Sequence, residues 1–373
     1  MSFRQAYEAT LLTIVTTRDL LSVAVLSVVL YAFYYPAPYS HQAAQALPIV
    51  VVDGDRGVLA RRLIEHLGDT RAIQLVGEVP GMAAARAAVR ERRAEGILLL
   101  SNDFAREAAA GRAGAGVGIW LNGSYLLRAE SIASALAETI EDALAERQAA
   151  LGTARGRSPP ILVHPLFNTT GGYRDYIFPA VANIILQQTL LFAGARLVAE
   201  RRRRGLRASG LAESLGRWAA CTTIGMLAAG FYFGFVFWVQ DIPRAGNLPA
   251  LAVAVPLFAG AVAALGLAAG SFFRNGDDAL KVLLPTSVPL VFLAGFAWPH
   301  AAMPGWLAAL SWLSPATAAM HLFTRLNQMG ATLSEVTGPL LVLALSIAVY
   351  LPVYLWRSRI GTVEPDTRPP VTR

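Results

Sequence analysis

The sequence predicts an α-helical membrane protein with six transmembrane helices and an extracytoplasmic α/β domain inserted between the first two. Two observations predict this fold class. Of the 373 residues, 55% are apolar and only 15% are charged, and the mean hydropathy of +0.46 is too high for an ordinary soluble protein of this size. Six uncharged stretches also approach or exceed the roughly 20 residues that a helix needs to cross a bilayer: Leu20–Tyr35, Tyr176–Ala195, Trp218–Val239, Leu248–Phe273, Val282–Trp298 and Val336–Trp356.

Residues 1–19 are expected to form an amphipathic entry helix on the cytoplasmic side. Apolar and aromatic side chains recur there at steps of three and four residues: Phe3, Tyr7, Leu11 and Ile14. This pattern suits a helix that lies in the membrane interface. The alternative is that these residues are simply the lower end of the first span, residues 20–36. That span ends in tyrosines and a proline instead of a small-residue cleavage site, so it is expected to stay as an uncleaved anchor.

Residues 37–173 alternate between apolar runs rich in β-branched residues and helical patterns. The runs predict strands over 47–53, 72–76, 96–100 and 117–121, with a last strand over 161–167. The segments with helical spacing are 56–68, 81–94, 103–112 and 125–150. Such alternation predicts a small α/β domain.

Residues 174–356 carry the second to sixth predicted spans, of which the fifth is expected to be broken. Residues 283–315 contain five prolines, at positions 285, 289, 299, 304 and 315, which exclude one straight helix. Irregular backbone survives at membrane depth only where protein or water satisfies the freed backbone groups. We therefore expect a re-entrant hairpin followed by an interfacial, Trp-rich helix.

The distribution of basic residues predicts the orientation. Short segments on the side of both termini carry fifteen Lys and Arg, against two, Arg244 and Arg325, on the other side. Both termini, including the tail 357–373, are therefore expected in the cytoplasm. The inserted domain has 14 Arg and 14 acidic residues, so the net charge of +7 comes from the membrane part. This favours contact with anionic lipid over contact with nucleic acid.

The sequence lacks the motifs of the enzyme classes that work at membranes. Its one lysine, Lys281, lies in "ALKVL" and cannot form a P-loop, and the five histidines show no metal-ligand spacing. No G-x-S-x-G motif is present, and the single cysteine, Cys221, cannot form a cysteine metal cluster. We expect neither catalysis nor a metal in this chain.

The layout and three segments resemble the ABC-2 type permeases, the drug-exporter branch of the ABC exporters. The segments are "ALPIVVVDGDRGVLARRLIEHL" at the start of the inserted domain, "YRDYIFPAVANIILQQTLLFAGARLVAERRRRG" in the second span, and "LAAGSFFRNGDDALKVLLPTSVPLVFLAGFAWPHAAMPGWLAALSWLSPATAAMHLFTRLNQMGA" in the fourth and fifth. The resemblance implies a permease subunit that pairs with itself or a sister permease. It also implies a separate ATPase that holds Mg-ATP, export of hydrophobic or amphiphilic compounds, and a periplasmic adaptor in Gram-negative relatives. The predominance of Arg over Lys suggests a bacterial source, so the expected location is the inner membrane.

The resemblance also points to residues that couple the permease to its ATPase. In the family, an E-x-G-T-type sequence with further acidic residues usually follows the second span. Here Glu200 and Gly205 are the matching candidates, while the Thr and the Glu that follow in the family are absent and arginines dominate the segment. Arg4 in the entry helix and the loop from Arg274 to Lys281 are the alternative coupling candidates.

The second span carries three amides inside an apolar helix: Asn183, Gln187 and Gln188. Asn183 and Gln187 share one helix face because they are four residues apart. Amides that faced lipid would leave donors unpaired, so these side chains are expected either to bond to other helices or to line a substrate path. Just before them, four residues are expected to form an interfacial collar at the outer surface: Tyr173, Arg174, Asp175 and Tyr176.

The sequence is also compatible with a second function. The chain would then be a membrane-anchored binding or receptor module that acts through its extracytoplasmic domain without transport. Five further spans with intramembrane amides and prolines exceed what an anchor needs, because polar groups in lipid are costly. The permease is therefore the favoured interpretation.

Overall fold

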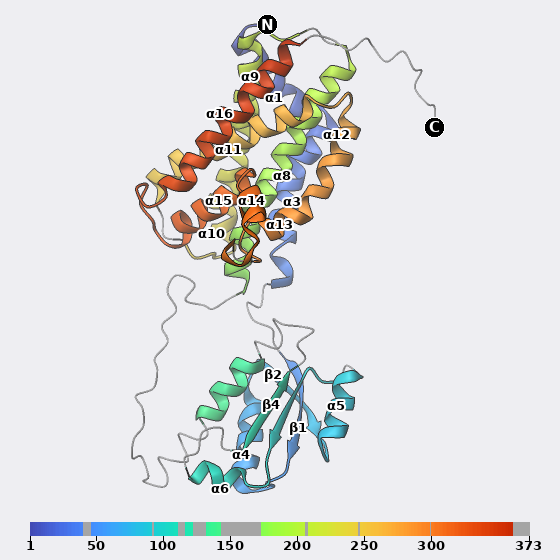
Figure 1. The fold of residues 1–373 in the computed structure, drawn as a ribbon, viewed down its shortest axis with the longest axis vertical. Helices are drawn as coiled ribbons and strands as arrows, with labels where there is room; N and C mark the ends of the chain where they lie inside the picture. Colours follow the sequence, from blue (N-terminus) through green and yellow to red (C-terminus); the bar gives the residue numbers. More distant parts are fainter. Residues whose placement is uncertain are drawn as a thin grey trace, which may run out of the picture. The chain divides into compact units, whose positions relative to one another are not determined.

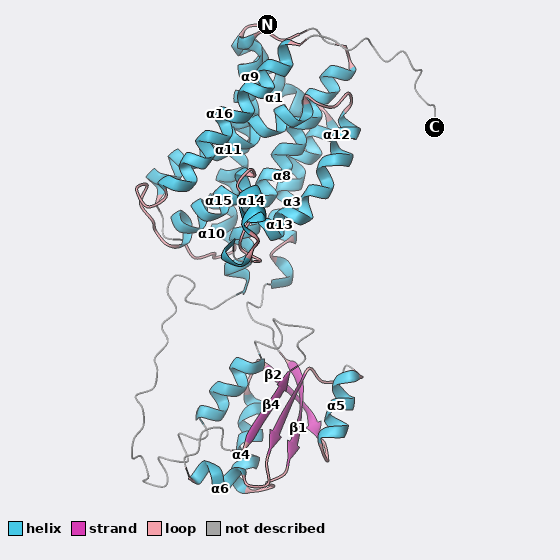
Figure 2. Cartoon of the chain, viewed as in Figure 1, coloured by secondary structure: helices cyan, strands magenta, loops and turns pink. Residues whose placement is uncertain are grey.

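The structure is a computed structural model that describes residues 1–39, 46–91, 93–110, 116–121, 132–142, 173–205, 208–244, 247–298 and 300–360. It contains two compact units (Figures 1 and 2). The α/β unit comprises His41–His164, and the membrane unit comprises Met1–Ser40 with Pro165–Arg373. The strand predicted over 161–167 lies outside the described residues.

The α/β unit contains one four-stranded sheet in the order β2-β1-β3-β4. Its strands are β1 (Leu47–Asp53), β2 (Ile73–Glu78), β3 (Gly96–Leu100) and β4 (Val117–Leu121). β1 runs parallel to β2 and β3, and β4 pairs antiparallel with β3. All four strands predicted in this range are confirmed, with β2 displaced slightly toward the C-terminus.

Helices cover both faces of this sheet. They are α4 (Val58–Asp69), α5 (Met82–Arg90), α6 (Phe104–Ala109) and a helix over 132–142. In β1, Ile49 and Val51 belong to the core that contains α4 and the helix over 132–142, whereas Val50 and Val52 belong to the core that contains α5. Figure 1 shows α4 and α5 on either side of the sheet. The run of apolar residues in β1 is continuous because both of its faces are buried.

Five helical segments of the membrane unit are long and apolar enough to cross a membrane: Arg18–Tyr39, Tyr173–Arg203, Leu211–Val239, Leu248–Gly270 and Thr337–Arg359. They correspond to the first, second, third, fourth and sixth predicted spans. Residues 282–298 are not among them, so a sixth span stays a prediction. The most apolar window of α8 (Tyr173–Arg203) is 83% buried, against 17% for α16 (Thr337–Arg359). The second span is therefore the central helix of the unit.

The predicted fifth region is broken, as the prolines indicate. Its elements are α12 (Gly276–Leu283), η5 (Leu284–Thr286), α13 (Ser287–Leu293), η6 (His300–Ala302), α14 (Gly305–Ser311), α15 (Pro315–Phe323) and η7 (Thr324–Gln328). A re-entrant hairpin followed by a Trp-rich helix was expected; in the structure α13 contacts α14, and α15 packs against α8 and α16. The backbone N–H of Ala316 donates to Gln187, and Gln328 donates to the carbonyl of Asp175. These contacts are twelve residues apart on each segment, so α15 and η7 run antiparallel to α8 over about 18 Å.

The entry helix α1 (Phe3–Thr16) is a separate helix that begins with a capping box between Ser2 and Gln5. It packs against α9 (Leu211–Gly230). Its buried side chains are Ala6, Thr10 and Ile14. Of the four side chains predicted to form its apolar face, only Ile14 is fully buried, and Phe3 is 47% exposed. Small residues permit close helix packing in membranes, while large apolar side chains can face lipid, which reverses the pattern of a soluble helix.

Close packing also joins α8 to α11 (Leu248–Gly270) through glycines. A Cβ atom added at Gly266 would lie 2.9 Å from the carbonyl oxygen of Leu191, and one added at Gly270 would overlap the backbone of Ala195. The four-residue spacing of these glycines is the small-xxx-small pattern of membrane helix pairs. Backbone contact between α8 and α11 therefore requires glycine at both positions.

Candidate functional site

One end of the membrane unit gathers the basic residues, and we call it the arginine-rich end. It carries Arg4, Arg196, Arg201–Arg204, Arg217, Arg274, Lys281 and Arg357. A cavity of about 610 Å³ opens there. It is lined by α1 with the start of the first span, by the last turns of α8, by the first turns of α12, and by Arg217 of α9. Glu200 and Lys281, two of the predicted coupling residues, both line this cavity.

Arg196 of α8 forms ion pairs with two other elements that line this cavity. Its Nη2 lies 2.6 Å from Oδ2 of Asp19, at the start of the first span, and its Nη1 lies 3.2 Å from Oδ1 of Asp277 in α12. Asn275 positions α12 because its side chain accepts the backbone N–H of Asp278 at 2.8 Å. The arginine side chain is only 22% exposed, whereas the side chains of Asp19 and Asp277 are 62% and 74% exposed, so both ion pairs lie at the solvent edge of the cavity.

The four consecutive arginines at the end of α8 point in different directions, because neighbouring helical residues lie about 100° apart around the axis. Arg203 and Arg204 pair with Glu200 at 2.6 Å and 3.4 Å. Arg201 turns inward and donates to Glu213 of α9 at 2.8 Å. The arginine run is therefore divided between separate sites.

Gly205 ends α8. Its φ of +63° is in the left-handed region that favours glycine, and its N–H donates to the carbonyl of Arg202 at 3.0 Å. A glycine at this position fixes where the second span stops and where the connection to α9 starts.

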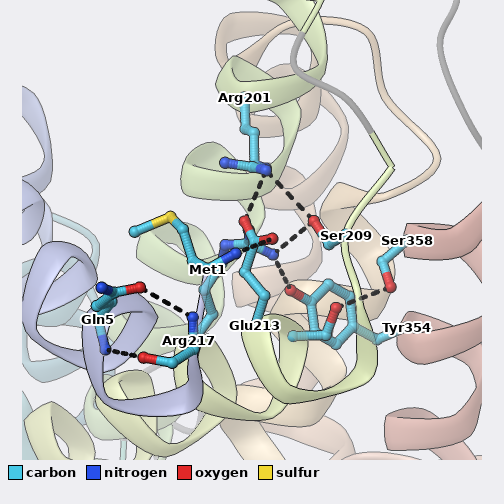
Figure 3. A network of polar contacts seen from close by, with 10 residues as sticks. Met1, Gln5, Arg201, Ser209, Glu213, Arg217, Tyr354 and Ser358 are labelled. Carbon is cyan, nitrogen blue, oxygen red and sulfur yellow. Dashed lines mark hydrogen bonds and ion pairs between the residues drawn. The ribbon is translucent and has the colours of Figure 1, made fainter.

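A buried ionic network lies beside the cavity (Figure 3). Glu213 and Arg217 are 7% and 6% exposed and pair with each other one turn apart in α9. Arg217 also donates to Ser209 at 3.0 Å and to the hydroxyl of Tyr354 in α16 at 3.3 Å. The network joins the ends of α8, α9 and α16. Sequence analysis missed it, although an acid and an arginine four residues apart at a helix start were a usable signal.

Two predicted coupling residues lie away from the cavity. Arg4 is on the exposed face of α1, where its Nε donates to Glu8 at 2.7 Å, and this hydrogen bond raises the pKa of the Arg4 guanidinium. Arg274 is exposed and lies near Arg202 and Arg357. Lys281 does line the cavity, and its Nζ lies 3.2 Å from Asp278.

The three amides of α8 are buried in the centre of the unit. Gln187 exchanges hydrogen bonds with Ser314 at 3.0 Å and 3.1 Å, and its Oε1 accepts the N–H of Ala316 at the start of α15 at 2.6 Å. Gln188 donates to Ser287 of α13 at 2.7 Å. Asn183 donates to its own helix, at the carbonyl of Pro179. Among the described residues, Oδ1 of Asn183 and Oε1 of Gln188 are buried without a hydrogen-bond partner.

The four residues of the predicted collar take different environments. Tyr176 is 48% exposed, and its hydroxyl donates to the carbonyl of Phe296 at 2.5 Å. The ring of Tyr173 contacts that of Tyr39 at a tilt of 59°, with ring centroids 5.1 Å apart. Asp175 is only 1% exposed and pairs with Arg174 at 3.1 Å. The acid therefore faces the bundle, unlike the surface position expected for it.

The model of the ABC-2 family transporter protein matches residues 18–356, which include four of the five long apolar helices completely and the fifth, α16, up to Trp356. The chain belongs to this family. Two curated relatives are 19% identical over 301 residues, covering 79% of this chain and 81% of each relative. They are the probable multidrug ABC transporter permease YbhR of Escherichia coli strain K12 and that of Escherichia coli O157:H7. This ABC-2 chain is thus a multi-pass membrane subunit of a transporter, and its family implies an ABC ATPase partner.

One further residue of this ABC-2 permease was not found from the sequence. Pro179 lies inside α8 and has no N–H to donate to the carbonyl of Asp175 four residues earlier. The side chain of Gln328 in η7 supplies that hydrogen bond at 2.8 Å. The proline in the "FPAVAN" segment was the available signal, since a freed carbonyl in a buried helix requires a donor from elsewhere.

Proposed function

We propose that this ABC-2 permease exports hydrophobic or amphiphilic compounds from the cytoplasm or the inner leaflet, driven by a separate ATPase that holds Mg-ATP. The observation that supports this most is the junction at Arg196. One side chain there joins the start of the first span, the end of α8 and the start of α12 around a charged cavity. An ATPase that contacts this end can move three elements together.

The proposed mechanism is a change between inward-open and outward-open states with different affinity for the compound, without covalent chemistry. In this proposal Gln187 and Gln188 hold α15 and α13 against α8. Asn183 is the candidate for the substrate path, because its Oδ1 is buried without a partner in the described part of the chain and, unlike those of Gln187 and Gln188, its hydrogen bonds stay within α8. A compound or a water molecule would supply the missing donor.

The proposed assembly places both termini and the arginine-rich end in the cytoplasm of a bacterial cell with this chain in the inner membrane. The excess of basic residues in the short segments on that side supports this orientation. A second permease chain, identical or related, completes the pathway, and a periplasmic adaptor joins the α/β unit. The receptor-module alternative is less favoured because the family match covers the spans as well as the α/β unit.

The test is ATP turnover by the ATPase co-expressed with this permease and reconstituted in lipid nanodiscs. We expect co-purification, turnover above that of the ATPase alone, and a further rise with a transported amphiphile. Arg196→Gln should reduce the stimulation several-fold because it frees α12 from the first span. Arg18→Gln is the matched control, since Arg18 is exposed and forms no ion pair within the described ranges. Failure of the permease to bind any ATPase would favour the receptor module.

A further inference from the structure

Three arginines from distant parts of the chain gather at the arginine-rich end, and none of them lines the cavity at Arg196. They are Arg202 at the end of α8, Arg274 after α11, and Arg357 near the end of α16. Nη2 of Arg357 donates to the carbonyl of Ser271 at 3.1 Å, and its guanidinium lies 4.7 Å from the ring centroid of Phe272. Arg202 is close enough to Arg274 and Arg357 to be repelled by both.

This cluster of three arginines lacks a counter-charge within the described part of the molecule. No described carboxylate lies within ion-pair distance of any of the three, whereas the adjacent Arg201 and Arg203 each pair with a glutamate. Nε of Arg202 and Nε of Arg357 are buried and have no hydrogen-bond partner among the described residues. Unpaired buried donors and three like charges both destabilise the folded unit. The arrangement therefore suits an anion that accepts several hydrogen bonds.

The neighbourhood of the cluster indicates what kind of anion fits. Guanidinium groups bind phosphate with paired hydrogen bonds. The cluster lies at the ends of three helices that are long and apolar enough to span a membrane, α8, α11 and α16. Phe272 and Trp356, beside Ser271 and Arg357 in the chain, are 59% and 61% exposed. Exposed aromatic rings next to basic side chains are typical of a membrane interface.

We propose that Arg202, Arg274 and Arg357 bind the headgroup phosphate of an anionic phospholipid whose acyl chains lie along Phe272 and Trp356. The bound phosphate supplies the counter-charge that the described protein lacks and links the ends of α8, α11 and α16. The site is separate from the junction at Arg196, so its lipid dependence and the coupling to an ATPase can be tested independently.

The experiment measures the unfolding midpoint of the full chain, purified in a nonionic detergent, during titration with three probes. The probes are phosphatidylglycerol, phosphatidylcholine and inorganic phosphate. We expect phosphatidylglycerol to raise the midpoint saturably, phosphatidylcholine to have little effect, and inorganic phosphate to act only at far higher concentration. Arg274→Gln should weaken the apparent affinity for phosphatidylglycerol about five-fold. That is the contribution to binding of one basic residue at an anionic membrane surface. Arg274 is exposed, so this variant should fold.

Arg359→Gln is the matched control, because it removes an exposed arginine from the same end of α16 as Arg357. Its affinity for phosphatidylglycerol should stay within about two-fold of the wild type, since one peripheral charge is screened by salt. An equal loss in Arg359→Gln and Arg274→Gln would show diffuse surface attraction and overturn the site. Inorganic phosphate that stabilises as well as the lipid, at similar concentration, would overturn the assignment to a phospholipid.

Discussion

At the scale of single residues, Glu213 is a buried acid whose negative charge balances two arginines. It is buried between Arg201 and Arg217, which approach it from α8 and from its own helix. Its neighbour at the same end, Glu200, pairs with Arg203 and Arg204, whose side chains are 59% and 66% exposed. A charge that is buried with its partners is far more costly to remove than an exposed one.

We therefore predict that Glu213→Gln lowers the free energy of unfolding of the membrane unit by about 3 to 5 kcal/mol, because it leaves two arginines without their shared carboxylate. Glu200→Gln, the matched control, should cost less than about 1 kcal/mol. Denaturant unfolding in mixed micelles measures both values. Equal losses for the two variants would contradict the role given to the buried network.

Gln187 and Asn183 share a face of α8 but have different hydrogen-bond partners: Gln187 bonds to α15, and Asn183 bonds within α8. Gln187→Leu removes the acceptor for the N–H of Ala316 and should cost about 1 to 3 kcal/mol. Asn183→Leu breaks only a bond to its own helix and should cost less, yet it should change substrate-stimulated ATP turnover if this residue lines the path. The measurements are thermal unfolding in detergent and turnover in nanodiscs. Unchanged turnover in Asn183→Leu would assign both amides to packing.

At the scale of elements, hydropathy and periodicity predicted much of the structure. The five long apolar helices and the four strands of the sheet follow from runs of apolar residues, because burial in lipid or between two helical layers requires such runs. Which side of α1 packs against α9 could not be predicted: the small residue Ala6 lies beside Gly216 of α9, and the hydroxyl of Tyr7 bonds to Thr223. In a membrane protein, apolar character does not distinguish a side chain facing lipid from one facing protein.

The contact between α8 and α11 shows the same role of small residues. Gly270→Ala should destabilise the membrane unit by about 1 to 3 kcal/mol, because the new methyl group overlaps the backbone of Ala195. Gly230→Ala in α9 is the control, since nothing lies within 4 Å of the added carbon, and it should change stability by less than about 1 kcal/mol. Thermal unfolding compares the two variants. A tolerated Gly270→Ala would mean that the helices are not in backbone contact.

The candidate site was only partly accessible from the sequence. The family resemblance pointed to Glu200 and Lys281, and both line the cavity. The partners of Arg217 could not be predicted, because Tyr354 is 137 residues away in the chain and only the fold brings them together. The same holds for Arg202, Arg274 and Arg357, which lie on three separate elements.

At the scale of the whole molecule, the contacts at the two ends of α8 differ in kind. At the arginine-rich end, ion pairs join the end of α8 to the start of the first span and to the starts of α9 and α12. A hydrogen bond from Arg217 to Tyr354 adds the end of α16. At the opposite end of α8, the contacts with other elements are instead a tilted ring contact between Tyr173 and Tyr39 and a hydrogen bond from Tyr176 to Phe296, and the ion pair of Arg174 with Asp175 lies within α8. Such an asymmetry suits a permease that receives force at one end and opens at the other.

Site-specific photo-crosslinking to the co-expressed ATPase tests this claim most directly. A photoreactive residue would replace Lys281 at the cavity in one variant and Tyr176 at the opposite end of α8 in another. Both side chains are exposed, so the two variants are matched. The account predicts a crosslinked permease–ATPase species from position 281 and none from position 176. Crosslinking from position 176 alone, or from neither position in a complex that co-purifies, would contradict it.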